Sequence, residues 1–433
     1  MKRLPILIPT LLFVTLACSL FSTGTPSPTQ TVSPPIAVSP TFPSDEPSTP
    51  PSLAEDVTSQ PPALVPTFPA PQPAVKHYHS GDAIVLDRIT MIDARKGWAI
   101  SGADVLFTGD GAKTWREATP PEVLPSGSQV HAQGGFPDAQ HAWIVFSVDS
   151  QIPTNAVVWS TSDFGYTWVP SAPLEHQAFG EQVWAEGFAL DGTYLWLMVR
   201  GVYVGAGTHY DAQLLRSASA GHIWQPLAGN ESFDYNYDYT GLVFADPDDG
   251  LVTWQTTGAY APGPPEYAVT SDGAANWTVG QLPPPSDTPN LFETFDYCEP
   301  FQPQMLSTSS IRLLVGCFDA YDPPHAFSSY LYSSEDGGST WTSVHLPEKV
   351  LASQVMLFFF DRDNALLLGR DIYRSVDGGQ RWDFVKSVTW DGQFSFVDPQ
   401  TGWAIARSNG QTALVKTSNG GAAWIELKPV IAP

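Results

Sequence analysis

Aspartates in a recurring eight-residue pattern are the residues of this sequence that most suggest chemistry. The pattern approximates Ser/Thr-x-Asp-x-Gly-x-Thr-Trp. Its acids are Asp110, Asp163, Asp272, Asp336 and Asp377, and its tryptophans are Trp115, Trp168, Trp224, Trp277, Trp341, Trp382 and Trp424. Carboxylates perform general acid–base catalysis and bind Ca²⁺. A carboxylate beside a Ser/Thr hydroxyl also accepts hydrogen bonds from turn amides, so we interpret these aspartates as structural residues of a tight turn.

The elements that hold these aspartates are short strands. The seven copies lie 41 to 64 residues apart, and a second pattern precedes each copy, as in DARKGWAI at 93–100 and DPQTGWAI at 398–405. Each unit therefore indicates two strands joined by an Asp-rich turn, then a loop, then two strands joined by an Asp-Gly turn. Seven such units predict an all-β fold, a seven-bladed β-propeller with four-stranded antiparallel blades.

The octapeptide resembles the Asp-box, or BNR, repeat, and its pairing with D-x-x-x-G-W-A closely resembles the propeller family of photosystem II assembly and stability factors. The resemblance covers residues from about 84 to 428. Ser219 and Asn419 stand where the repeat has Asp, and Ala112 stands where it has Gly. The resemblance implies a membrane-tethered propeller that assists the assembly of another protein. The photosynthetic partner is not carried over, because nothing in the chain indicates a photosynthetic host.

The first 75 residues indicate export and attachment to a membrane. A basic start, an apolar run from Leu4 to Ala17 and then Cys18 resemble a bacterial lipoprotein signal, with residues 1–17 as signal peptide and Cys18 as the lipidated residue. The alternative is a plain signal peptide with an incidental Cys. Residues 18–75 are rich in Pro, Ser and Thr, so we expect a disordered tether before a propeller over residues 76–433. We therefore expect an extracytoplasmic, membrane-tethered and monomeric protein.

Long insertions in the second to fifth units are the candidate binding surface. If the blades are up-and-down, the loop between the second and third strands and the crossing to the next blade emerge on one face, opposite the two Asp-containing turns. We call this the loop face. We expect it to carry Tyr203, Tyr210, Tyr235, Tyr237, Tyr239, Tyr260, Tyr267, Tyr297 and Tyr321, with Asp234 and Asp238. Tyr is a rigid contact residue, so the hypothesis is that these residues bind a protein partner or a cell-surface glycan. The alternative is that the loop aromatics pack against one another.

Cys298 and Cys317 flank the first two strands of the fifth unit. Because those strands form a hairpin, the two residues should lie nearly opposite, and in an oxidising compartment we expect a disulfide between them. The alternative is a pair of buried thiols.

Charge and motif content limit the remaining function classes. The 44 acidic residues against 20 Lys and Arg give a net charge of −24, which disfavours nucleic-acid binding. No pattern indicates a cofactor or a metal, and His77 and His79, at the tether junction, are interpreted as incidental. BNR repeats also occur in sialidases and other glycoside hydrolases. Arg200 and Arg312, with Glu181, Glu186 and Tyr203, are the best catalytic candidates, so a glycoside hydrolase or a carbohydrate-binding propeller stays the alternative to a binding scaffold.

Overall fold

The computed structural model describes residues 69–122, 129–148, 156–174, 184–190, 194–204, 209–227, 237–256, 262–319 and 326–433. The chain divides into two units, Met1–Leu64 and Val65–Pro433. The signal peptide, Cys18 and most of the tether lie outside the described residues and stay predictions. Among the described residues, no helix is both long enough and apolar enough to cross a membrane.

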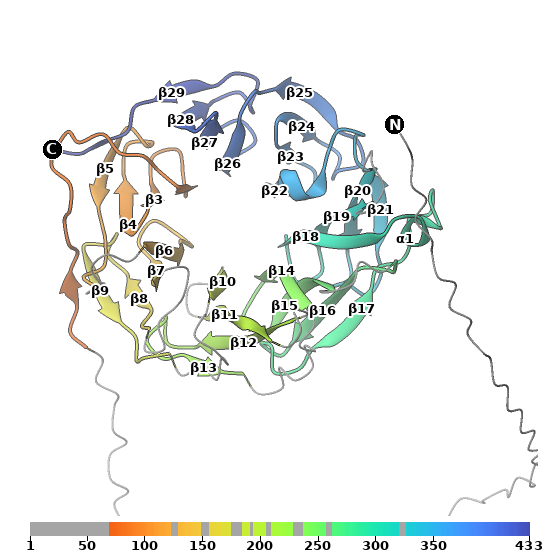
Figure 1. The fold of residues 1–433 in the computed structure, drawn as a ribbon, viewed down its shortest axis with the longest axis horizontal. Coiled ribbons are helices and arrows are strands. Elements are labelled where there is room, and N and C mark those ends of the chain that lie inside the picture. The colour runs from red at the N-terminus through yellow and green to blue at the C-terminus, as the bar shows by residue number, and fades with distance from the viewer. Residues whose placement is uncertain are drawn as a thin grey trace, which may run out of the picture. The chain divides into compact units, whose positions relative to one another are not determined.

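Seven small sheets arranged in a ring form the second unit, which confirms the predicted seven-bladed propeller (Figure 1). The first three blades comprise β2 (Arg88–Met91), β3 (Gly97–Ser101), β4 (Asp104–Thr108) and β5 (Thr114–Glu117); β6 (Val130–Gly135), β7 (Ala142–Val148), β8 (Trp159–Thr161) and β9 (Thr167–Pro170); and β10 (Trp184–Leu190), β11 (Leu195–Val204), β12 (His209–Ser217) and β13 (Gln225–Pro226). The fourth and fifth comprise β14 (Tyr237–Phe244), β15 (Asp249–Thr256), β16 (Glu266–Ser271) and β17 (Thr278–Gln281); and, after the short helix α1 (Leu291–Thr294), β18 (Tyr297–Met305), β19 (Ile311–Phe318), β20 (Phe327–Ser334) and β21 (Thr342–His345). The last two comprise, after the 3₁₀ turn η2 (Ala352–Gln354), β22 (Met356–Phe359), β23 (Ala365–Leu368), β24 (Asp371–Ser375) and β25 (Asp383–Ser387); and β26 (Asp391–Phe396), β27 (Gly402–Ser408), β28 (Gln411–Thr417) and β29 (Ile425–Leu427).

The hydrophobic core lies between neighbouring blades. The second strand of a blade is covered on both faces, so its sequence is a continuous apolar run: β23 is buried throughout and β19 is buried except at its last residue. The outermost strands β17, β21 and β25 are largely exposed and polar. Between blades 1 and 2, Trp98 of β3 packs in one buried cluster with Ile144 of β7 and Trp168 of β9.

A tight turn closes the third and fourth strands of every blade. Two successive residues in this turn have positive φ, as Ala220 (51°) and Gly221 (86°) do in blade 3. The amide of the second residue is buried and donates to the Ser/Thr hydroxyl four residues earlier, for example Gly221 N to Ser217 Oγ at 3.0 Å. In the six blades whose first turn is described, the amide of the first residue donates to a carbonyl of that turn, as Gly378 N does to Asp363 O at 2.9 Å. Both turns therefore lie together on one face, as predicted; we call it the turn face.

The two ends of the propeller close the ring by adding strands to blades 1 and 2. The strand β30 (Val430–Ile431) pairs in parallel with β5, and β1 (Gln72–Pro73) pairs antiparallel with β9. Blades 1 and 2 therefore have five strands rather than the predicted four, and the propeller begins before residue 76. Blade 7 also joins blade 1 directly, because Gln393 Oε1 accepts the amide of Ile89 at 2.8 Å.

The left-handed conformation of Ala220 should lower the stability of the folded chain. A residue with a Cβ is strained at positive φ by about 1–2 kcal/mol, whereas glycine is not. We expect Ala220→Gly to raise the free energy of unfolding by about 0.5–1 kcal/mol, after the extra entropy of the unfolded glycine chain is subtracted. Denaturant unfolding of both proteins measures the difference.

The matched control is Ala422→Gly. Ala422 is an exposed alanine of the blade 7 turn and is not one of the positive-φ residues. We expect this substitution to lower stability by about 0.5–1 kcal/mol, the ordinary cost of glycine. Equal effects of the two substitutions would contradict the assignment of strain to Ala220.

Candidate functional site

The five box aspartates lie on the turn face, and each bonds to its own turn. Asp163 Oδ1 accepts the amides of Tyr166 and Thr167 at 3.0 and 2.9 Å and the hydroxyl of Thr161 at 2.8 Å, while Oδ2 accepts the hydroxyl of Thr167 at 2.7 Å. Burial alone raises the pKa of Asp163, but these hydrogen bonds outweigh burial and hold the pKa below its usual value. The pKa values of Asp110, Asp272, Asp336 and Asp377 are lowered as well. These carboxylates are therefore ionised and already bonded, which suits a structural role.

The tryptophans of the repeat connect the turn face from blade to blade. Trp115 and Trp168 are fully buried, Trp224 is buried, and Trp277, Trp341, Trp382 and Trp424 are half-buried. The second-strand tryptophans reach the next blade: Trp143 Nε1 donates to Ala220 O at 3.0 Å, and Trp403 Nε1 donates to Gly111 O at 3.2 Å. These tryptophans therefore belong to the scaffold.

The predicted loop-face residues divide into three groups. Asp234, Tyr235, Tyr260 and Tyr321 lie outside the described residues. Tyr203 and Tyr210 are directly opposite each other in the β11–β12 hairpin, and Tyr237, Asp238 and Tyr239 open β14 at its loop-face end. Tyr239 and Tyr297 are half-buried: Tyr239 packs against the cluster around Trp254, and Tyr297 stacks on Phe318 with ring centroids 5.2 Å apart. For these two tyrosines, the packing alternative holds at least in part.

Tyr267 is a buried strand residue and not the loop residue that the sequence predicted. The sequence placed it in a loop, but it lies in β16, is 6% exposed, and donates its hydroxyl to Gly338 O of blade 5 at 2.7 Å. Its ring meets Trp341 edge to face with centroids 5.2 Å apart. Tyr267 is therefore a core residue that joins blades 4 and 5, because the third strand of blade 4 begins at Glu266, earlier than the sequence suggested.

The disulfide predicted between Cys298 and Cys317 is present in the structure. The two residues are directly opposite on β18 and β19, with their Cα atoms 4.0 Å apart. Cys298 is the second residue of β18 and Cys317 the next-to-last residue of β19, so the disulfide lies at the loop-face end of blade 5.

Of the five catalytic candidates, only Arg312 has a side chain that the structure describes. Arg312 is only 3% exposed on its side chain, and its guanidinium is bonded to Glu335 at 2.7 Å and to Ile311 O at 2.9 Å. Arg312 therefore joins the turn between β18 and β19 to the Asp-box turn of the same blade, in which Glu335 lies. Arg200 and Glu186 lie in β11 and β10, paired with other positions, and Glu181 lies outside the described residues.

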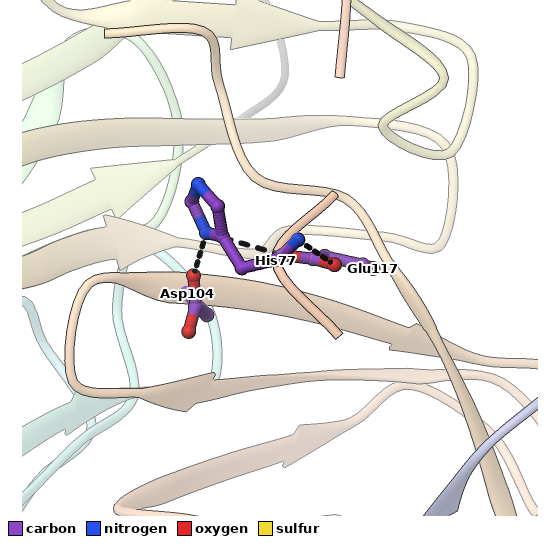
Figure 2. Close-up of side chains that lie close together, drawn as sticks. All are labelled: His77, Asp104 and Glu117. Atoms are coloured by element: carbon purple, nitrogen blue, oxygen red, sulfur yellow. Dashed lines mark hydrogen bonds and ion pairs between the residues drawn. The ribbon is translucent and has the colours of Figure 1, made fainter. Parts of the chain in front are cut away.

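Three side chains that the sequence did not connect meet at the loop-face end of blade 1 (Figure 2). His77 Nδ1 lies 2.7 Å from Asp104 Oδ1 and 3.3 Å from Glu117 Oε1. Asp104 opens β4 and Glu117 ends β5, so both are at the loop-face end of their strands. The sequence signal that could have indicated this cluster is His77 itself, because it precedes a blade in which one acid opens a strand and another ends one.

No protein-family model and no curated protein matches the sequence. A solved structure of YCF48 bound to D1 peptide is 16% identical, with a TM-score of 0.49, over 80% of this chain and 100% of its own; YCF48 from Cyanidioschyzon merolae is 15% identical, with a TM-score of 0.48, over 81% and 99%. The GH74 enzyme of Niastella koreensis is 14% identical, with a TM-score of 0.34, over 78% and 62%. These likenesses concern the propeller fold alone and decide neither activity nor partner.

The stability that the box aspartates contribute should depend on pH. Because their folded pKa values are lowered, their contribution to stability is present above the usual Asp pKa of about 3.9 and is lost as pH falls through the lower folded values. We expect Asp163→Ala to lower the free energy of unfolding at pH 7 by about 1–3 kcal/mol, because its donors lose their acceptor. The difference should shrink as pH falls below about 4.

Asp163→Asn is the matched variant, because Asn419 already fills this position in blade 7 and accepts the amide of Ala423 at 2.8 Å. Asn keeps one acceptor and does not titrate, so we expect a smaller loss at pH 7 than for Ala. Denaturant unfolding between pH 7 and pH 3 measures both. A difference from wild type that grows on acidification would contradict the assignment.

Proposed function

We propose that this chain is an extracytoplasmic, lipid-anchored binding scaffold that holds a protein partner on the loop face of blades 2 to 5. The observation that carries the proposal is the unequal length of the strands. β11 and β12 have ten and nine residues, whereas β3 and β4 of blade 1 have five each and β23 of blade 6 has four. The hairpin of blade 3 is therefore longer than blades 1 and 6 need in order to pack.

The blade 3 hairpin shows where the additional length lies. The β10–β11 pairing is described up to Trp184↔Arg200, while the β11–β12 pairing continues through Tyr203↔Tyr210 to Val204↔His209. The hairpin thus extends on the loop face and places two tyrosines side by side in register. Tyr pairs on a rigid scaffold supply contact area at a low cost in conformational entropy. This arrangement suits binding.

Two further features favour binding over chemistry. The repeat carboxylates, which are the most numerous candidates for acid–base catalysis, are ionised and bonded to turn amides on the opposite face. Arg312, a candidate for a substrate carboxylate, is buried against Glu335. The chain has a net charge of −24. Because complementary charge speeds association, we expect the partner to present Lys and Arg at the interface.

If the loop face binds the partner, replacing Tyr203 and Tyr210 should weaken the affinity. Once a partner or glycan has been captured by the full chain and identified, we expect the Tyr203→Ser/Tyr210→Ser double variant to bind it about tenfold or more weakly, because buried aromatic contacts dominate interfaces. Titration calorimetry measures the change. A glycan array and a glycoside hydrolysis screen on the wild-type chain test for glycan binding and for glycosidase activity.

The matched control is Tyr166→Ser on the turn face, since Tyr166 is 59% exposed and lies in the blade 2 box. We expect its affinity to equal that of the wild type. Equal loss in both variants, or no loss in the loop-face variant, would contradict the proposed surface. Turnover of any glycoside would replace the scaffold with an enzyme.

If Cys18 is lipidated, the chain should carry a fatty acid and stay with the membrane. In a bacterial host fed a labelled fatty acid, we expect the wild-type chain to carry the label and to sediment with membranes, and the Cys18→Ser variant to do neither. The Cys298→Ser/Cys317→Ser variant is the control and should keep the label, because those residues pair with each other. An unlabelled wild-type chain released into the medium would show a plain signal peptide.

A further inference from the structure

We propose that His77, Asp104 and Glu117 form a binding site for one divalent transition-metal ion, best matched by Zn²⁺. The ion would fasten the segment that follows the tether to blade 1. One ligand atom from each of the three residues lies within 4.8 Å of the other two. They come from three separate elements: the segment before β2, the start of β4 and the end of β5.

Glu117 is the residue that points most directly to a bound cation. Its side chain is 3% exposed, and Oε2 accepts the amides of His77 and Tyr78 at 2.6 and 3.2 Å. Oε1 is buried and accepts no hydrogen bond from the described residues. A buried carboxylate oxygen without a donor costs free energy, and here that oxygen faces His77 Nδ1 at 3.3 Å. A cation between the three groups would satisfy it.

Two separations between ligand atoms, both measured from His77 Nδ1, can be compared with those of a metal site. Ligands about 2.0–2.1 Å from a tetrahedral Zn²⁺ are roughly 3.3 Å from one another. The His77 Nδ1 to Glu117 Oε1 distance already has this value, and the Nδ1 to Asp104 Oδ1 distance of 2.7 Å requires a small rotation of exposed His77. The His77 side chain is 54% exposed, so an ion can reach the site from solvent.

The chemistry of the ligands selects the class of ion. One imidazole nitrogen with two carboxylate oxygens suits Zn²⁺, whereas sites for Ca²⁺ and Mg²⁺ are made of oxygens alone. Two carboxylates so close together also require more than one positive charge. The Asp104 and Glu117 carboxylates both face Nδ1 of His77, at 2.7 and 3.3 Å. A divalent ion balances both acids.

The experiment is a titration of the full chain, freed of metal with a chelator, with ZnCl₂ followed by calorimetry. We expect one tight site. His77→Ala and Asp104→Asn should each weaken it by at least about tenfold, since loss of even an outer-shell partner has effects of about 10–100-fold. With CoCl₂ in place of ZnCl₂, the wild-type chain should show the visible absorption of a bound four-coordinate Co²⁺, and His77→Ala should not.

His79→Ala is the matched control. His79 is two residues away and lies 3.5 Å from Asp82 Oδ2, but its side chain is 93% exposed and has no buried acid beside it. We expect unchanged affinity. Asp104→Asn preserves shape, so circular dichroism of the chelated proteins separates loss of binding from loss of folding. The proposal is overturned if the wild-type chain binds no Zn²⁺ at micromolar concentrations, or if His77→Ala and His79→Ala bind it equally.

Discussion

In every blade, a buried amide in the turn that joins the third and fourth strands donates to a Ser or Thr hydroxyl four residues earlier, from Ala112 N to Thr108 Oγ1 in blade 1 to Gly421 N to Thr417 Oγ1 in blade 7. The bond requires two successive residues at positive φ, which directs their carbonyls toward the neighbouring blade. Trp403, Trp143 and Tyr267 donate to such carbonyls. The same turn thus stabilises its own blade and, in blades 1, 3 and 5, its contact with the preceding blade.

This arrangement leaves the two faces with different freedom to vary. The turn face is bonded within and between blades, so insertions there would break several hydrogen bonds at once. The hairpin of blade 3 extends on the loop face to strands of ten and nine residues, while its turn keeps the bond from Gly221 N to Ser217 Oγ. A scaffold constrained on one face and variable on the other suits a binding protein.

Much of the fold could be predicted because the repeat is a local signal: the spacing of tryptophans, the apolar second strands and the Asp-Gly turns each report on a few neighbouring residues. Position along a strand was harder, which is why Tyr267 was assigned to a loop. Ring closure was not predictable, since β1 and β30 have two residues each and no strand pattern. The His77 cluster was missed because its members are 27 and 40 residues apart and meet only in the folded ring.

Hydrogen exchange on the full chain tests most directly whether the box turns form one continuous support around the ring. The amides to follow are the seven that donate to the Ser/Thr hydroxyls, of Ala112, Gly165, Gly221, Ala274, Gly338, Gly379 and Gly421. The account predicts that all seven exchange in one slow class, including those of blades 1 and 7 beside the closure, because each turn is held by its own blade and its neighbour. Fast exchange at blades 1 and 7 with slow exchange at blades 4 and 5 would contradict it.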